Sequence, residues 1–225
     1  MPEFCETEAS ESLQPWTLAK AISSFPTIPE INSTSPLPFF HLLERLKTTP
    51  REGWRQAGLS QTESISDHMY RMAIMVLLAP PSISPQLRTS RCLKMVLIHD
   101  MAEAVVGDIT PKESIPKLEK ARRGDTAMRY IAQTLLGNVP GGKEAGEEII
   151  SLFREYEDGV TLEAVFAHDL DKLEMVLQAV EYERLHGRDL AEFYHVVEDI
   201  RLPVVREWAE MVMKEREGLG MDMPF

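Results

Sequence analysis

The sequence predicts an all-α fold, a single bundle of seven or eight helices. Three observations lead to this fold class. After Leu37, apolar residues recur at intervals of three and four, which is the period of a helix with one buried face. Glycine and proline residues divide this pattern into segments of helical length. No segment shows the alternating, β-branched composition that is typical of a strand.

The first helix is predicted to begin at Leu37, because Phe40, Leu43 and Leu46 would share one of its faces. Residues 48–63 should follow as a loop, since proline and glycine interrupt any helical pattern there. This loop separates the first helix from a second one with a clear start signal.

Ser64 and Asp67 have the spacing of a capping box, in which two side chains cap each other's backbone amides. A helix is therefore expected to begin here and to end before Pro80. A longer, continuous helix is expected at residues 86–106, with Gly107 as its C-terminal cap. Further helices are predicted at residues 118–136, 144–157, 161–186, 189–199 and 203–217.

The composition divides the chain into three parts. Residues 1–36 are rich in Ser, Thr, Pro and Glu, which is typical of a flexible extension. Within them, the apolar piece from Trp16 to Phe25 has the length of one or two helical turns. Residues 37–217 form the predicted domain, and residues 218–225 form a short tail.

The charge balance excludes several classes of partner. The 225 residues carry 24 Lys and Arg against 36 Asp and Glu, a net charge of -12. Nucleic-acid polymers and anionic membranes are bound by basic surfaces, so neither is an expected partner. No apolar run reaches the roughly 18 residues that span a bilayer. With two cysteines and no signal-peptide pattern at the N-terminus, the chain is expected to be intracellular. The expected compartment is the cytoplasm, and the nucleus stays open as an alternative.

The segment LIHDMAEAVVGD places His99 and Asp100 side by side within an apolar helical pattern. A buried aspartate must be paired or must bind a cation, because burying an isolated charge is costly. Imidazoles and carboxylates are ligands of divalent transition metals. Glu103 follows one helical turn later, within reach of both residues. The pair is therefore a candidate metal site, although such a dipeptide alone occurs often by chance.

Two other segments offer ligands of the same kind. His68 stands in the first turn of the helix that begins at Ser64. Asp169 and Asp171 lie two residues apart on the helix at 161–186, so at most one of them faces a given site. Spacing alone does not decide which one. The order His, His-Asp, Asp on three apolar helices favours a metal site over three unrelated core or surface residues.

The segments ESISDHMYRMA, LIHDMAEAVVGDITP and DLDKLEM together resemble the HD-domain phosphohydrolases. The chain is most similar to the small 5′-deoxynucleotidases among them, the HD domain-containing protein 2 group of eukaryotes and its bacterial relatives. The upstream segment PREGW also matches this group. The resemblance implies an HD-domain bundle at residues 37–217 and metal-dependent hydrolysis of deoxynucleoside 5′-monophosphates to deoxynucleosides and phosphate.

The resemblance also assigns roles to single residues. It implies His68, His99, Asp100 and Asp171 as metal ligands, in preference to Asp169. It implies Glu103 as the catalytic acid or base. A second ion would use Glu103, Asp108 and the carbonyl of Ile109, in which case Glu103 becomes a ligand. These ligand types do not distinguish among Mn²⁺, Co²⁺, Mg²⁺, Fe²⁺ and Zn²⁺.

Three implied substrate contacts each have a structural alternative. Arg51 would hold the phosphate through two hydrogen bonds, or it would pair with Glu52 as an ordinary loop residue. Trp54 would pack on the sugar or anchor its loop. Asp108 would exclude a 2′-hydroxyl, bind the second ion or cap the turn at Thr110.

Two other functions compete with the deoxynucleotidase. One is an HD hydrolase for deoxynucleoside triphosphates or other nucleotides, and the other is a non-catalytic helical scaffold. The scaffold is disfavoured because every implied ligand position is intact. The resemblance further implies a homodimer. The last helix has an apolar stripe that would either support this dimer or pack within the chain, formed by Val204, Val205, Trp208, Met211 and Val212.

Overall fold

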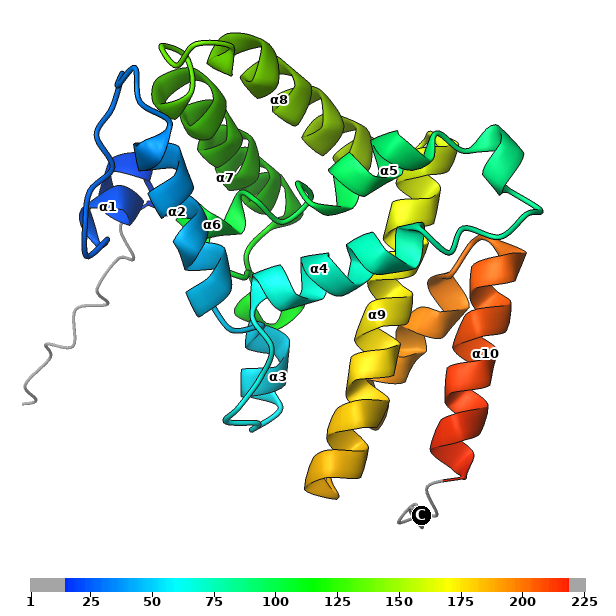
Figure 1. Cartoon of the computed structure of the whole chain (residues 1–225). Helices are drawn as coiled ribbons and strands as arrows, with labels where there is room; N and C mark the ends of the chain where they lie inside the picture. The colour runs from blue at the N-terminus through cyan, green and yellow to red at the C-terminus, as the bar shows by residue number, and fades with distance from the viewer. Residues whose placement is uncertain (1–14, 219–225) are drawn as a thin grey trace, which may run out of the picture.

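The computed structural model describes residues 15–218, and helices dominate this range (Figure 1). The elements are α1 (Leu18–Ser23), α2 (Leu37–Thr48), α3 (Glu52–Gln56), α4 (Ile65–Val76), η1 (Ser84–Gln86), α5 (Thr89–Val96), α6 (Glu103–Val106), η2 (Pro111–Glu113), α7 (Lys117–Arg129), the π-helical η3 (Tyr130–Leu135), α8 (Gly142–Asp158), α9 (Leu162–His186), η4 (Ala191–Asp199) and α10 (Pro203–Glu217). The all-α class is confirmed for the described residues. The short helix α1 lies in the apolar piece that had the length of one or two helical turns, whereas α3 was not predicted.

Helix α9 is the axis of the bundle. Helices α4, α5, α8, α10 and η4 all pack against it, and Figure 1 shows α10 running beside it. Its side chains are buried on more than one face, as expected for a helix enclosed by neighbours. It begins where the Thr161 hydroxyl accepts a hydrogen bond from the amide of Ala164. It ends at Gly187, whose positive φ of 59° is the usual left-handed helix cap.

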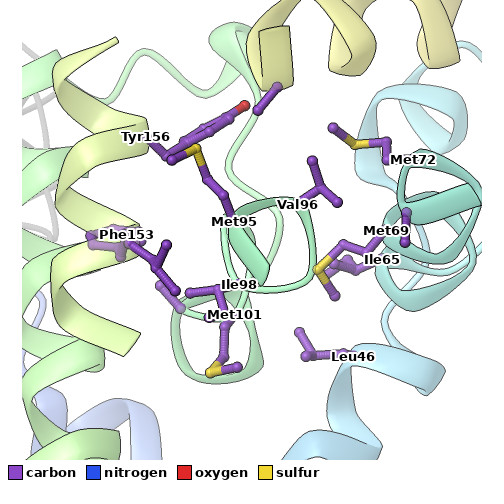
Figure 2. Close-up of a cluster of buried hydrophobic side chains, with 14 of the residues drawn as sticks. Leu46, Ile65, Met69, Met72, Met95, Val96, Ile98, Met101, Phe153 and Tyr156 are labelled. Atoms are coloured by element: carbon purple, nitrogen blue, oxygen red, sulfur yellow. The ribbon is translucent and has the colours of Figure 1, made fainter. Parts of the chain in front are cut away.

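The main core lies between α4, α5, α8 and α9. Met69 and Met72 of α4 are buried in it. Figure 2 shows them on one side of Val96, with Met95 on the other. Flexible methionine side chains fill such irregular spaces well. Close packing here holds α4 and α5 in fixed positions, which matters because α4 carries His68 and α5 leads to His99.

The prediction of one continuous helix at residues 86–106 was wrong. The chain leaves the helix after Val96, passes through turns at residues 97–102, and forms only the short α6 afterwards. Several backbone amides in this stretch donate to the carbonyl three residues back instead of four. The break falls on His99 and Asp100, and aspartate is a poor residue for a helix interior. Both side chains therefore leave an irregular backbone, with orientations that a straight helix does not provide.

The prediction of a loop at residues 48–63 was also wrong in part, because this segment contains the short helix α3. A tertiary contact stabilises the start of this short helix: the amide of Glu52 donates to Asp108 Oδ2 over 2.7 Å. Free amides at a helix start need such an acceptor. The segment expected as a helix at residues 189–199 is the 3-10 helix η4, and its Tyr194 hydroxyl donates a hydrogen bond of 2.7 Å to Glu183.

The described part of the N-terminal extension packs on the domain. Helix α1 contacts α6 and α7, and Phe25 is buried beneath the guanidinium of Arg45, which lies 3.9 Å from the ring centre. For residues 15–36 this contact replaces the flexible chain that we expected. Residues 1–14 and the tail from residue 219 onward lie outside the described residues.

The apolar stripe of α10 packs mostly within the chain. Val205 is fully buried, and Val204, Trp208 and Val212 pack against the main core, whereas Met211 is exposed. This packing accounts for the stripe without a second copy. No helix in residues 15–218 has both the length and the apolar character needed to cross a membrane.

Candidate active site

His68 is held at one end of its ring by Glu174, and its other ring nitrogen faces Asp171. The predicted capping box is confirmed: Ser64 Oγ accepts from the Asp67 amide, and Asp67 Oδ2 accepts from the Ser64 amide. It starts α4 so that His68 stands in the first turn, where its side chain is fully buried. Nδ1 of His68 lies 2.6 Å from Glu174 Oε2, and Nε2 lies 3.2 Å from Asp171 Oδ1.

His99 lies in the turn between α5 and α6, and its side chain reaches the same site as that of His68. Its Nδ1 lies 2.9 Å from the carbonyl oxygen of Val96. A carbonyl only accepts hydrogen bonds, so Nδ1 carries the proton and Nε2 carries the lone pair. That lone pair faces the site, where Nε2 lies 3.2 Å from Asp100 Oδ2. The ring centres of His68 and His99 are 5.5 Å apart.

The two candidate aspartates of α9 point to different partners. Asp171 lies beside His68, and its Oδ2 accepts a hydrogen bond of 3.0 Å from the hydroxyl of Tyr156. Asp169 is fully buried on another face, where it accepts hydrogen bonds from the backbone amides of Arg201 and Leu202. Asp171 is therefore the one that reaches the site, and Asp169 ties α9 to the start of α10.

The donor atoms fit a divalent cation. Nε2 of His68, Nε2 of His99 and a carboxylate oxygen of Asp171 lie within 4.8 Å of one another. Both Nε2 atoms are buried and have no hydrogen-bond partner among the described residues. Unsatisfied buried polar atoms are rare and need an explanation. A transition-metal ion that is bound by imidazole nitrogen and carboxylate oxygen supplies one.

Arg51 lies on the rim of this group of ligands. Its Nη1 donates to Asp100 Oδ2 over 3.0 Å and is 4.0 Å from Asp108 Oδ1. The alternative pairing with Glu52 is not formed, because Glu52 pairs with Arg55 instead. Burial raises the pKa of Asp100, but His99 and Arg51 lower it more strongly, so that it stays well below its usual range. The carboxylate beside Arg51 is therefore ionised at neutral pH.

Trp54 and Asp108 both shape the loop that carries Arg51. Trp54 is only 3% exposed, donates from Nε1 to Glu63 over 2.9 Å and packs edge-on against Tyr182. This burial favours the loop anchor over a contact with the sugar. Asp108 caps α3, as described above, and so connects the loop to the segment after α6.

Comparison with known proteins places this architecture in a family. A sequence profile of the HD domain matches residues 43–210. The chain belongs to the HD-domain family. This HD-domain protein is 46% identical over 188 residues to the 5′-deoxynucleotidase hdd1 of Schizosaccharomyces pombe, covering 82% of this chain and 92% of that one. It is 43% identical over 162 residues to the human 5′-deoxynucleotidase HDDC2, covering 71% and 75%.

A solved structure agrees with this assignment. The protein from Magnetospirillum magnetotacticum described as a "predicted metal-dependent phosphohydrolase" superposes with a TM-score of 0.60 at 25% identity. The match covers 84% of this chain and 96% of that one. The family resemblance inferred from the sequence motifs is therefore confirmed.

The four implied ligands, which are His68, His99, Asp100 and Asp171, form what we call the ligand group. Glu103 of this HD-domain protein lies at the edge of the ligand group, on the first turn of α6. It is buried, and its Oε2 has no hydrogen-bond partner within the described part of the chain. Burial and the charges of Asp100 and Asp108 raise the pKa of Glu103 well above its usual value. A carboxyl group with a raised pKa can hold a proton at neutral pH and exchange it with a substrate.

The sequence analysis missed three polar residues of this site. Glu174 contacts His68, Tyr156 contacts Asp171, and Lys120 donates from Nζ to the carbonyl of Ile109 over 2.8 Å. Glu174 follows Asp171 by three positions on a helix, so the spacing alone indicated a shared face. Tyr156 and Lys120 come from α8 and α7, and no local pattern connects those helices to the motifs.

Proposed function

We propose that this HD-domain protein is a metal-dependent 5′-deoxynucleotidase, which hydrolyses deoxynucleoside 5′-monophosphates to deoxynucleosides and phosphate. One observation carries the proposal: two buried imidazole nitrogens without hydrogen-bond partners converge with Asp171, and an arginine lies next to them. The names of the relatives at 46% and 43% identity supply the substrate class.

His68, His99, Asp100 and Asp171 would hold the cation, which Mn²⁺, Co²⁺, Mg²⁺, Fe²⁺ and Zn²⁺ all suit by ligand type. When bound, such a cation polarises a phosphoryl oxygen and acidifies water. The protein fixes the ligands beforehand: Val96 orients His99, and Tyr156 orients Asp171. Ligands that are already oriented reduce the conformational cost of binding.

Arg51 and Glu103 would act on the substrate itself. The guanidinium of Arg51 lies beside Asp100, so a phosphate close to the cation would also be close to Arg51. Glu103 would hold or accept the proton that moves during cleavage of the phosphate ester, since its carboxyl group is buried and has a free oxygen. Trp54 would act on the substrate indirectly, by fixing the loop of Arg51.

Asp108 and the carbonyl of Ile109 are implied ligands of a second ion. Lys120 donates to the Ile109 carbonyl, and its ammonium is near enough to Glu103 to lower the pKa of that carboxyl. A second cation at Glu103, Asp108 and the Ile109 carbonyl would therefore compete with Lys120. This contact supports a site with one ion, in which Asp108 caps α3 and limits space for a 2′-hydroxyl.

A phosphate-release assay tests the substrate class. Deoxynucleoside monophosphates, ribonucleoside monophosphates, deoxynucleoside triphosphates and cyclic nucleotides would be offered with Mn²⁺ or Co²⁺. Release from the deoxynucleoside monophosphates supports the proposal. Tripolyphosphate from the triphosphates, with no release from monophosphates, would replace it with a triphosphohydrolase.

Metal analysis tests the choice between enzyme and scaffold. The purified wild-type protein should hold a stoichiometric divalent ion, and His99→Ala should lose both the ion and the activity. A protein without an ion, and with no activity to lose in His99→Ala, would be a scaffold. The homodimer stays a prediction from the resemblance, and sedimentation of the full chain tests it. The intracellular location stays a prediction from the sequence alone.

A further inference from the structure

We infer that Glu174 is a positioning residue for the metal site, which fixes the ring of His68 and the nitrogen that it presents. The inference rests on the proposed function, because it takes His68 to be a metal ligand. Glu174 is fully buried on α9, one helical turn after Asp171. Its Oε2 lies 2.6 Å from His68 Nδ1, within the distance range of a strong hydrogen bond to a charged group.

The direction of this hydrogen bond decides which nitrogen is available. A carboxylate accepts hydrogen bonds, so Nδ1 of His68 must carry the proton. In the neutral ring that binds a metal, Nε2 then presents its lone pair toward Asp171 and His99. The same tautomer is set at His99 by a backbone carbonyl. Glu174 is therefore the side-chain counterpart of that carbonyl.

Arg71 holds Glu174 in turn. Its Nε donates to Glu174 Oε1 over 2.8 Å, and its Nη1 donates to Glu181 Oε2 over 2.7 Å. Nη2 of the same guanidinium contacts Gln178. Because Arg71 neutralises the buried carboxylate, Glu174 keeps its charge without the full cost of desolvation.

The contacts of Glu174 join α4 and α9, and each helix supplies two residues with the same spacing. Helix α4 supplies His68 and, three residues later, Arg71, while α9 supplies Asp171 and, three residues later, Glu174. Each helix thus contributes one residue to the ligand group and one to the supporting pair. Both oxygens of Glu174 already accept hydrogen bonds, which argues against Glu174 as a ligand of a separate ion with Glu63 and His68.

A second buried glutamate on the same helix provides a matched control. Glu183 is 1% exposed, is paired with Arg216, and accepts from the hydroxyl of Tyr194. Among the described residues, neither Glu183 nor Tyr194 has a hydrogen bond or ion pair to His68, His99, Asp100 or Asp171. If Glu174 only stabilised the fold, replacing either glutamate by glutamine would have the same kind of effect.

The test compares Glu174→Gln with Glu183→Gln, and the probe is Co²⁺. Calorimetric titration of the metal-free proteins gives the affinity, and the visible spectrum of the Co²⁺ complex reports the ligand geometry. Loss of a partner that orients a metal ligand typically weakens metal affinity by about 10–100-fold. We expect this loss and an altered spectrum in Glu174→Gln, and wild-type values in Glu183→Gln.

The outcomes separate the inference from the proposed function. Wild-type protein that binds no Co²⁺ overturns the proposed function, and the inference falls with it. Wild-type protein that binds Co²⁺, with equal affinity in Glu174→Gln, overturns the inference alone. If Glu174→Gln does not fold, Arg71→Met replaces it, since Arg71 is partly exposed. Weaker Co²⁺ binding in Arg71→Met supports the inference, and unchanged binding overturns it.

Discussion

Arg51 and Asp100 are joined by a hydrogen bond of 3.0 Å, from Nη1 to Oδ2. The contact places a permanent positive charge directly beside an implied metal ligand. It also connects the loop before α4 to the turn that carries His99. The same guanidinium is 4.0 Å from Asp108, and the charges of Asp100 and Asp108 raise the pKa of Arg51 despite its burial. Arg51 is thus held in place before any phosphate arrives.

Arg51→Lys should impair phosphate binding while the fold is kept. Lysine retains the charge, but it lacks the planar group that forms two parallel hydrogen bonds. Hydrogen bonds to charged groups contribute about 1.5–3 kcal/mol each, so we expect kcat/KM for a deoxynucleoside monophosphate to fall by about 10–100-fold. Steady-state kinetics at saturating metal would measure this. Unchanged kcat/KM would show that Arg51 only pairs with Asp100.

Asp169→Asn and Asp171→Asn should have opposite effects on metal binding. Asp171→Asn removes a ligand, so metal binding should be lost. It also removes a contact that raises the pKa of His68, so part of the stabilisation of the metal-free protein should be lost as well. Asp169→Asn places an amide NH₂ near backbone donors of Arg201 and Leu202, which should cost about 1–3 kcal/mol of stability and leave metal binding intact. Metal titration and denaturant unfolding of both variants check the pair. A reversed pattern would assign the ligand to Asp169.

Glu103→Gln should lower kcat by about 10²–10⁴-fold, the usual contribution of a general acid or base. If one ion binds, the affinity for that ion should stay within a few-fold of the wild type, because Glu103 is not among its ligands. Metal analysis by mass spectrometry gives the ion count in both proteins. Loss of one of two bound ions in Glu103→Gln would instead make Glu103 a ligand.

Metal affinity should rise with pH. Burial and the charge of Arg51 lower the pKa of His68, but contacts with Asp171 and Glu174 raise it more, to about 10 in the metal-free protein. Binding requires the neutral imidazole, so a proton must leave Nε2. Between about pH 7 and about pH 9, the apparent affinity should therefore increase by up to ~10-fold per pH unit. Calorimetry in buffers of different ionisation enthalpy measures the proton release directly.

The same shift has a consequence for the stability of the metal-free protein. The pKa of His68 is higher in the folded chain than its ordinary value of 6.5. The stabilisation from its protonated form is therefore complete below about pH 6.5 and is lost as the pH rises through about 10. Thermal unfolding in the presence of a chelator should show this decline. A stability that increases over this range would contradict the assigned shift.

Trp54→Ala should destabilise the protein by about 3–5 kcal/mol, the usual cost of removing a buried aromatic side chain. Activity should fall as well, because the loop of Arg51 loses its anchor on Glu63 and Tyr182. Trp54→Phe keeps the ring packing but not the hydrogen bond, so its loss of stability should be smaller. If Trp54→Ala instead raised KM without any loss of stability, a contact with the sugar would be the better explanation.

The sequence by itself determined most of the helices. The period of apolar residues predicted α9 and α10 to within a residue at each end, and the spacing of Ser64 and Asp67 located the start of α4. These features are local, because a helix and its caps depend on residues within a few positions of one another. The His-Asp motif and its resemblance to HD-domain proteins gave the family for the same reason.

Only the tertiary structure decided how the segments meet. Whether Asp169 or Asp171 reaches His68 depends on how α9 is rotated against α4, and this rotation is set by packing of the shared core. The interruption of the helix at His99 and the contact of Glu174 with His68 depend on neighbours that are distant in sequence. Local periodicity contains no information about such contacts, since they are fixed by close packing and by the need of buried polar atoms for partners.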